Sequence, residues 1–140
     1  MIVNNSFSRS IDLLHRGMST ASLSGAVIGN NLANVDVPNF KRTDVNFESE
    51  LRRALDTERQ RPVLELERTH QSHFPNWEPM DYRDVSPRRV LDYLSQSKNN
   101  GNNVDAEEEF SLLLKNQLRY MLLAQMATFE FSQVNMILRG

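Results

Sequence analysis

The 140-residue chain contains no cysteine, which excludes disulfide bonds, thiol nucleophiles and thiolate metal sites. No stretch reaches the roughly 18 to 20 apolar residues that a membrane-spanning helix needs, so we expect none. The first ten residues include polar Asn4, Asn5 and Ser6 and lead into no long apolar run, so no secretory signal is expected. If the protein leaves the cytoplasm, we expect an export route that cleaves nothing.

Charge is scarce at both ends of the chain. Residues 1–35 carry only Arg9, Asp12 and Arg16, and residues 110–140 carry only four charged side chains, whereas residues 41–92 hold 21 of the 34. The net charge of −2 gives no reason to expect a nucleic acid or an anionic membrane as a partner. Two nearly uncharged ends therefore flank a charged middle of mixed sign.

Both ends have apolar residues at alternating spacings of three and four, which is typical of helices that pack against another helix. The N-terminal seam consists of Ile11, Leu14, Met18, Ala21, Gly25, Ile28 and Leu32. The C-terminal seam consists of Phe110, Leu113, Gln117, Tyr120, Ala124, Ala127, Phe131, Val134 and Leu138. The spacing predicts one helix from about residue 6 to 34 and a second over 104–139, with Asp105 as its N-terminal cap.

The second predicted helix also carries apolar residues outside its seam. Its other faces carry Leu114, Leu118, Met121, Leu122 and Met126. A helix that is apolar most of the way round is normally buried, and a chain of this length has too little mass to bury it alone. We therefore expect other chains to cover it, as in a structural subunit.

The middle is predicted to hold loops and short elements. Residues 48–59 have the pattern of a short amphipathic helix, and Val63, Leu64 and Leu66 that of a short strand. Residues 86–96 favour a short helix with Ser86 as cap and Pro87 at its first position. A turn-rich run, SKNNGNN, occupies residues 97–103.

Residues 30–47 read NNLANVDVPNFKRTDVNF and predict the end of the first helix followed by a reversal. Asn34 is expected to cap the helix in the left-handed conformation, and Pro38 cannot continue it. Residues 38–40 then form a turn. Asn39 is the least costly residue after glycine at a positive φ, so this turn tolerates the absence of glycine.

This segment resembles the N-terminal signature of the flagellar axial proteins, which form the rod, hook and hook-associated structures. The matching positions are Asn31, Ala33, Asn34, Pro38, Phe40, Lys41 and Arg42. Val37 departs from the usual Thr, which removes one capping hydroxyl, and Asn39 departs from the usual Gly.

Further positions resemble the short proximal rod proteins among these families. They are Thr43, Asp44, Val45 and Phe47, the run 69–74 with His73, and Asn103, Val104, Asp105, Glu109, Asn116, Leu118 and Tyr120. The resemblance therefore covers both ends and part of the middle.

The resemblance implies a fold and a function. The fold is mainly all-α: residues 1–40 and 104–140 form a discontinuous domain, an antiparallel coiled coil of the two long terminal helices, and residues 41–103 form an irregular middle with short helix and strand elements. The implied function is a structural subunit of the proximal rod of the flagellar basal body. It would be part of the axial drive shaft and of the export channel wall.

The implied partners are other copies of the chain, the basal-body protein FliE, other rod proteins, the gate of the flagellar type III exporter and the inner-membrane ring. No nucleic acid, small-molecule substrate, cofactor or metal is implied. Phe7 and Ile11 resemble the gate's Phe-x-x-x-apolar pattern, and they are equally consistent with ordinary helix packing.

Other functions are conceivable. His70 and His73, with nearby acidic residues, suggest a metal or acid–base site, but no nucleophile or phosphate-binding motif accompanies them. A soluble coiled-coil adaptor would use the same helices, but it has no reason to carry the signature of residues 30–42. Another proximal rod component is the nearest alternative.

Overall fold

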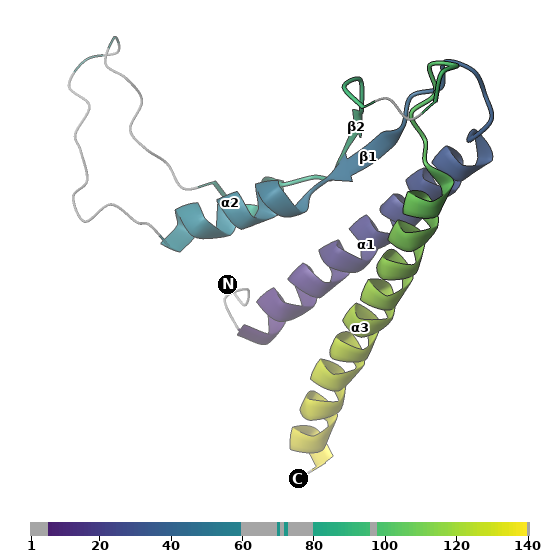
Figure 1. Ribbon diagram of the computed structural model, residues 1–140. Coiled ribbons are helices and arrows are strands. Elements are labelled where there is room, and N and C mark those ends of the chain that lie inside the picture. Colours follow the sequence, from purple (N-terminus) through teal and green to yellow (C-terminus); the bar gives the residue numbers. More distant parts are fainter. Residues whose placement is uncertain (1–5, 60–69, 71, 73–79, 96–97, 140) are drawn as a thin grey trace. The chain divides into compact units, whose positions relative to one another are not determined.

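The computed structural model describes residues 6–59, 70, 72, 80–95 and 98–139 (Figure 1). In chain order these residues form α1 (Ser6–Ala33), β1 (Thr43–Asn46), α2 (Glu48–Arg59), the 3-10 helix η1 (Tyr82–Asp84), β2 (Arg88–Leu91) and α3 (Ala106–Arg139). The chain divides into two compact units, residues 1–45 with 89–140 and residues 46–88. No helix in the described ranges is long and apolar enough to cross a membrane.

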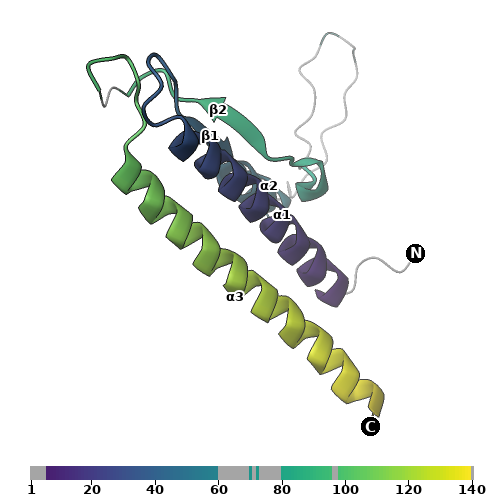
Figure 2. The same ribbon diagram turned by 90° about the vertical axis from the view of Figure 1, so that its right-hand side faces the viewer.

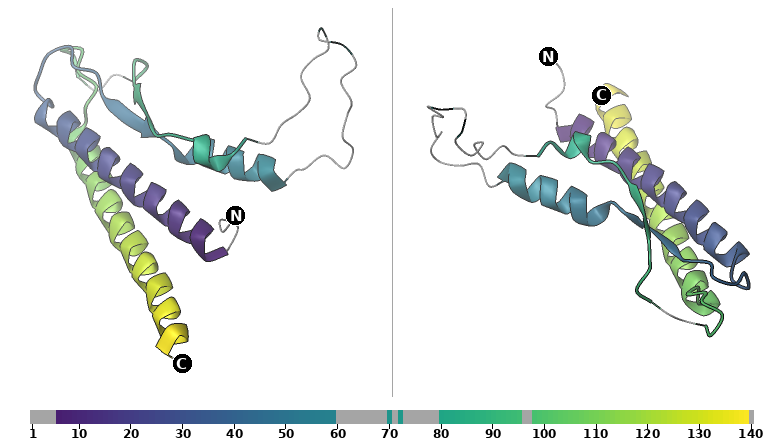
Figure 3. Two further views of the ribbon diagram at one scale, coloured as in Figure 1. Left: turned by 180° about the vertical axis from the view of Figure 1, so that it is seen from behind. Right: turned by 90° about the horizontal axis from the view of Figure 1, so that it is seen from above.

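The first unit is built on α1 and α3, which lie side by side (Figures 2 and 3). Three contacts mark their course: Phe7 with Phe131, Gly17 with Leu123, and Ala21 with Asn116. Residue numbers rise along α1 while they fall along α3, so the two helices are antiparallel. The predicted pairing of the terminal helices is confirmed.

The start of α3 follows from its sequence. The Asp105 carboxylate accepts hydrogen bonds from the backbone N–H groups of Glu107, at 2.9 Å, and Glu108, at 3.4 Å. Two of the N–H groups that a helix leaves unpaired at its start are thereby satisfied, as predicted from Asp105. Residues 104–139 contain neither glycine nor proline, so nothing interrupts the helix before Arg139.

Residues 88–91 form strand β2, which pairs with β1 in a two-stranded sheet. The predicted helix over 86–96 is therefore wrong. Pairing with β1 outweighs the local preference for a helix that Ser86 and Pro87 indicate. The strand pairing extends by one more hydrogen bond, which the backbone N–H of Asp92 donates to the carbonyl of Arg42 at 2.9 Å. The Asp92 carboxylate accepts bonds from the N–H groups of Leu94 and Ser95, so it caps the turn after the strand.

The second unit contains α2, as predicted for residues 48–59, and η1, which contacts it. Phe47, Ala54, Tyr82 and Val85 are its buried apolar residues. The predicted strand at Val63–Leu66 lies outside the described residues.

Candidate functional site

The signature segment leaves α1 through a series of tight turns. Asn34 N–H donates to the carbonyl of Asn31, and Val37 N–H donates to that of Asn34, each at 3.1 Å. In the final turn, the backbone N–H of Phe40 donates to the carbonyl of Val37. Pro38 is the second of the four residues of this turn, and Asn39, with a φ of 61°, is the third. Proline followed by a residue of positive φ is the pattern of a type II turn.

Asn39 is the only non-glycine residue with a positive φ in the described part of the chain. The predicted left-handed cap at Asn34 is therefore wrong, because the helix end tightens into right-handed turns before the reversal. The Asn34 side chain instead donates to the carbonyl of Asn30, one helical turn earlier. The left-handed residue comes five positions later, where the axial signature has glycine.

A loop before α3 holds the signature turn, and we call its residues Asn102 and Asn103 the asparagine clasp. The Asn102 side chain is fully buried, and its Nδ2 lies 2.8 to 3.0 Å from the carbonyl oxygens of Asn34, Val35 and Val37. Its Oδ1 accepts from Val104 N–H at 2.7 Å. One amide side chain thus joins the end of α1 to the segment that starts α3.

Asn103 holds the other side of the same junction. Its Oδ1 accepts from the backbone N–H of Arg42 at 2.6 Å. Its Nδ2 donates to the carbonyl of Asp92 at 2.7 Å and to the hydroxyl of Ser95 at 3.1 Å. The clasp therefore ties the signature to the segment after β2 as well as to α3.

Two lysines connect the signature segment to the loop before α3, one extending from each side. The Lys41 ammonium donates to the carbonyl of Gly101 at 2.8 Å, and the Lys98 ammonium donates to that of Val35 at 2.7 Å. Gly101 has φ 79°, and a Cβ on it would lie 2.6 Å from Oδ1 of Asn39. The loop and the turn therefore fit closely only because this residue is glycine.

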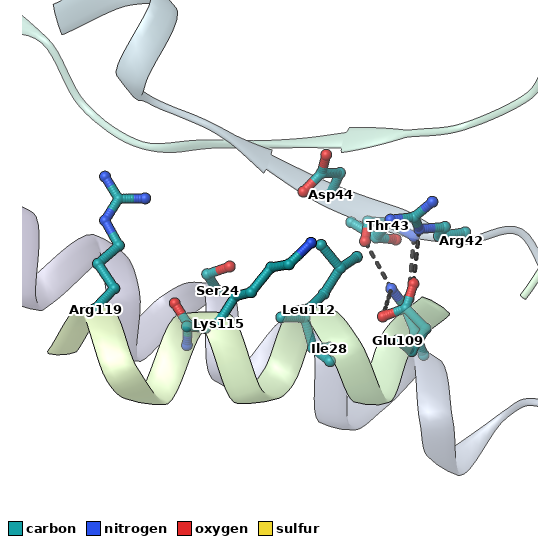
Figure 4. Close-up of a pocket in the computed structure, with 11 residues that line it drawn as sticks. Ser24, Ile28, Arg42, Thr43, Asp44, Glu109, Leu112, Lys115 and Arg119 are labelled. Carbon is teal, nitrogen blue, oxygen red and sulfur yellow. Dashed lines mark hydrogen bonds and ion pairs between the residues drawn. The ribbon is translucent and has the colours of Figure 1, made fainter. Parts of the chain in front are cut away.

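A polar cluster of the buried residues Asn31 and Glu109 and the half-buried Arg42 lies next to the clasp (Figure 4). The Asn31 amide exchanges hydrogen bonds with the backbone of Thr43, at 2.8 and 3.1 Å, and donates to Glu109 Oε2 at 3.2 Å. Arg42 Nε lies 2.7 Å from Glu109 Oε1, and its Nη1 lies 3.3 Å from Glu108 Oε1. The Glu109 carboxylate thus joins α3 to α1 through Asn31 and to the segment before β1 through Arg42.

Burial raises the pKa of the Glu109 carboxyl above its ordinary value. The Asn31 hydrogen bond and the Arg42 charge act in the opposite direction, since both stabilise the ionised form. The loss of hydration outweighs them.

A cavity of about 170 Å³ adjoins this cluster, on the side of the helix pair that β1 covers (Figure 4). Ile28 and Leu112 contribute apolar lining, and Lys115, Arg119 and Asp44 contribute charge. Within the described ranges, no group of three His, Cys, Asp or Glu side chains is arranged to hold a metal ion. His70 Nδ1 accepts from Ser72 N–H at 3.2 Å, whereas His73 lies outside the described residues.

The most conspicuous surface of the first unit is apolar. Large hydrophobic side chains of α3 are exposed on more than one face of the helix. They are Phe110, Leu114, Leu118, Tyr120, Met121, Leu122, Met126, Phe129, Phe131, Met136, Ile137 and Leu138. We call this set the α3 apolar surface. Monomeric proteins rarely expose continuous apolar areas of this kind, so the surface marks a site of interaction with other proteins.

Comparison with known proteins agrees with the geometry. The family model "Flagella basal body rod protein" matches residues 11–41. The chain is 41% identical to the flagellar basal body rod protein FlgB of Borreliella burgdorferi, and 44% identical to that of Borrelia hermsii, each over 96% of the chain and 99% of the relative. The chain belongs to the FlgB family. The FlgB of Bacillus subtilis is 32% identical, with 96% of both chains covered.

Membership of the FlgB family makes the chain a structural protein of the flagellar basal body rod rather than an enzyme. It also implies assembly with other rod proteins. The sequence prediction of family and function is confirmed at this level.

The structure places most of the signature residues in the polar junction. Asn31, Asn34, Lys41 and Arg42 make the hydrogen bonds and ion pairs described above, and Pro38 sets the turn. Phe40 is half-buried, and Ala33 is exposed. The sequence indicated only a turn-rich run at residues 97–103, and its buried partners were not predicted. The available signal was the density of asparagine just before a capped helix, since asparagine both donates and accepts.

The predicted seam residues differ in exposure within a single chain. On α1, Ile28 is buried and Ile11, Leu14, Met18 and Leu32 are half-buried. On α3, Leu113 and Val134 are half-buried, whereas Phe110, Tyr120, Phe131 and Leu138 are exposed. Phe7, half-buried, meets Phe131 edge to face at a centroid distance of 5.9 Å.

We predict that Asn102→Asp destabilises the first unit by about 1 to 3 kcal/mol or more, because an acceptor would then face three carbonyl oxygens. The measurement is urea unfolding of the purified chain in trimethylamine N-oxide, which favours compact states. Asn99→Asp is the matched control, since it adds the same charge at an exposed residue of the same loop. Equal effects of the two changes would contradict a role for the buried amide.

We predict that Gly101→Ala is destabilising for two separable reasons, contact with Asn39 and a positive φ. Combining it with Asn39→Gly removes the contact but leaves the φ strain of roughly 1 to 2 kcal/mol. The double variant should therefore recover part of the lost stability in the same unfolding assay. Additive losses from the two changes would show that loop and turn are not in contact.

We predict that the Glu109 carboxyl titrates above its ordinary pKa, as measured by NMR of ¹³C-labelled glutamate. Because the folded state binds this proton more tightly than the unfolded state, the group's contribution to stability is fully present below the unfolded pKa. It is lost as pH rises through the folded pKa. Glu109→Gln should remove this pH dependence, and Arg42→Met should raise the pKa further. A midpoint at or below the ordinary value would refute the argument from burial.

Proposed function

We propose that the chain is a subunit of the proximal rod, where it forms part of the axial drive shaft and of the wall of the export channel. The observation that carries the proposal is the α3 apolar surface, which a single chain leaves in water. The near full-length similarity to FlgB relatives favours this role over a soluble coiled-coil adaptor. Other proximal rod components remain the nearest alternative, and location in the rod separates them.

The proposed mechanism is assembly coupled to ordering of the chain. Each Å² of apolar surface that neighbouring subunits cover contributes about 25 cal/mol, which offsets the entropy lost when the helices become ordered. The free subunit is then only marginally folded, and its ends become fully helical within the rod. In dilute solution, circular dichroism should show partial helicity. A fully helical monomer that melts cooperatively would count against this mechanism.

The ends and the middle of the chain are proposed to have different roles, because charge is distributed unevenly between them. Residues 1–40 and 104–140 would form the discontinuous coiled-coil domain of the axis, because α3 exposes many large apolar side chains and because residues 1–35 and 110–140 together carry only seven charges. Residues 41–103 would make polar contacts that set orientation, since they carry most of the charges. Within the axial part, the seam residues that one chain leaves exposed are proposed to meet neighbouring subunits.

The signature is proposed to fix the geometry of the helix pair rather than to contact a ligand. Its residues are bound to the clasp and to Glu109, so the end of α1 is held against the start of α3. A helix pair with one fixed end presents its apolar faces in a defined relation. Defined faces are what repeated assembly of identical subunits requires.

The proposed partners are further copies of the chain, FliE, other rod proteins and the inner-membrane ring, with the type III export gate acting before assembly. Phe7 and Ile11 are proposed to form the gate-recognition pattern. In the paired state Phe7 contacts Phe131 and both residues are half-buried, so recognition would have to precede pairing of the helices.

We predict that Leu118→Glu combined with Leu122→Glu excludes the chain from rods and abolishes motility. Both side chains are more than half exposed in the single chain, so the change should leave the monomer's circular dichroism unaltered. In the rod it would bury charge, at a cost of several kcal/mol per ion. The measurement is cryo-electron microscopy of basal bodies purified from cells that carry a tagged copy.

Gln125→Glu is the control, because it adds charge at an exposed α3 residue that is already polar. Tagged wild-type density in the innermost rod layer would support the proposal. Normal rods built from the double variant would contradict the apolar interface, and a wild-type chain found only in a soluble complex would favour the adaptor.

A further inference from the structure

An open groove of about 470 Å³ runs between α1 and α3, and these two helices contribute all of its lining. On α1 the wall consists of the small residues Ala21, Ser22 and Gly25. On α3 it consists of Leu113, Tyr120 and Met121 with the polar, uncharged Asn116 and Gln117. No Asp, Glu, Lys or Arg lines the groove. It is therefore an uncharged depression that exists because one wall lacks large side chains.

The far end of α3 has the complementary chemistry. Residues 131–138 contain no charge, and the three large side chains Met136, Ile137 and Leu138 are 73 to 78% exposed. We call Met136–Leu138 the α3 tail. Large exposed apolar side chains are suited to a depression in which one wall, that of α1, consists of small residues.

The tail cannot reach the groove of its own chain. Leu138 follows Met121 by 17 residues on the same uninterrupted helix, which places it about 25 Å further along the axis at 1.5 Å per residue. Any tail that occupies the groove must therefore come from a different molecule.

We infer that the groove of one copy accepts the α3 tail of a second copy. The inference rests on the proposed function, since it names one contact through which rod subunits assemble. Absence of charge on both surfaces avoids the cost of burying an unpaired ion. Because groove and tail are different surfaces, the contact is head-to-tail and can repeat from one copy to the next without closing on itself.

The chain has no cysteine, so an engineered pair gives a disulfide with no background. Ser22→Cys is introduced into one tagged copy and Leu138→Cys into a second copy with a different tag. Both are expressed in the same cells, and the mixed disulfide is measured in oxidised, purified basal bodies. Ser24→Cys replaces Ser22→Cys as the control, because Ser24 lines the cavity on the other side of the helix pair.

We expect at least about fivefold more mixed disulfide from the Ser22→Cys pair than from the Ser24→Cys pair, since the bond requires Cα atoms within roughly 7 Å. Equal yields, or none, in rods that contain both tagged copies would overturn the inference and leave the proposed function intact. Absence of the tagged wild-type chain from rods would overturn both.

Filling the groove gives an independent measurement. Ser22→Trp should reduce incorporation into rods at least about fivefold, because the indole would occupy the space that the tail needs. Ser19→Trp is the control at an exposed α1 residue outside the groove lining. Equal incorporation of the two tryptophan variants would overturn the inference.

Discussion

The first unit depends on the satisfaction of buried amides at one end of its helix pair. Asn102 carries hydrogen bonds to three carbonyl groups, and Asn31 binds both β1 and the carboxylate of Glu109. These groups would be costly if unpaired, so the turn and the start of α3 have one arrangement in which all are satisfied. That arrangement sets the register of α3 against α1. Polar contacts at the junction thus provide the specificity that a smooth apolar helix pair lacks.

The rest of α3 differs from this polar junction, because it exposes many large apolar side chains. Its apolar side chains face water on more than one side. Among the described residues of the first unit, only four apolar residues are buried: Ala21, Val27, Ile28 and Val104. A chain built to be stable alone would cover these faces with charge. On the proposed function, the protein keeps a well-defined junction, and its neighbours in the rod would supply the remaining burial. Folding and assembly would then be parts of one process.

The long helices, the Asp105 cap and α2 were predictable because periodicity and capping are local properties of the sequence. The likeness to rod proteins was equally readable from residues 30–42. The strand at 88–91 was not, because its partner lies more than forty positions away and local cues at Ser86 and Pro87 favoured a helix. Left-handed residues were expected at both Asn34 and Asn39, and of these two only Asn39 has a positive φ. The expectation at Asn34 failed because several turn types can end a helix. The clasp depends on contacts across about 65 residues, which no local pattern encodes.

Beyond its first turn α3 has few charged residues, and this scarcity of charge determines how its contacts respond to the medium. Between residues 110 and 140 only Lys115, Arg119, Glu130 and Arg139 are charged. Salt screens interactions between ions and leaves apolar burial largely unaffected at moderate concentration. An axis held together through such surfaces would keep its cohesion when the ionic strength around it changes, whereas contacts made through the charges of residues 41–92 would change in strength.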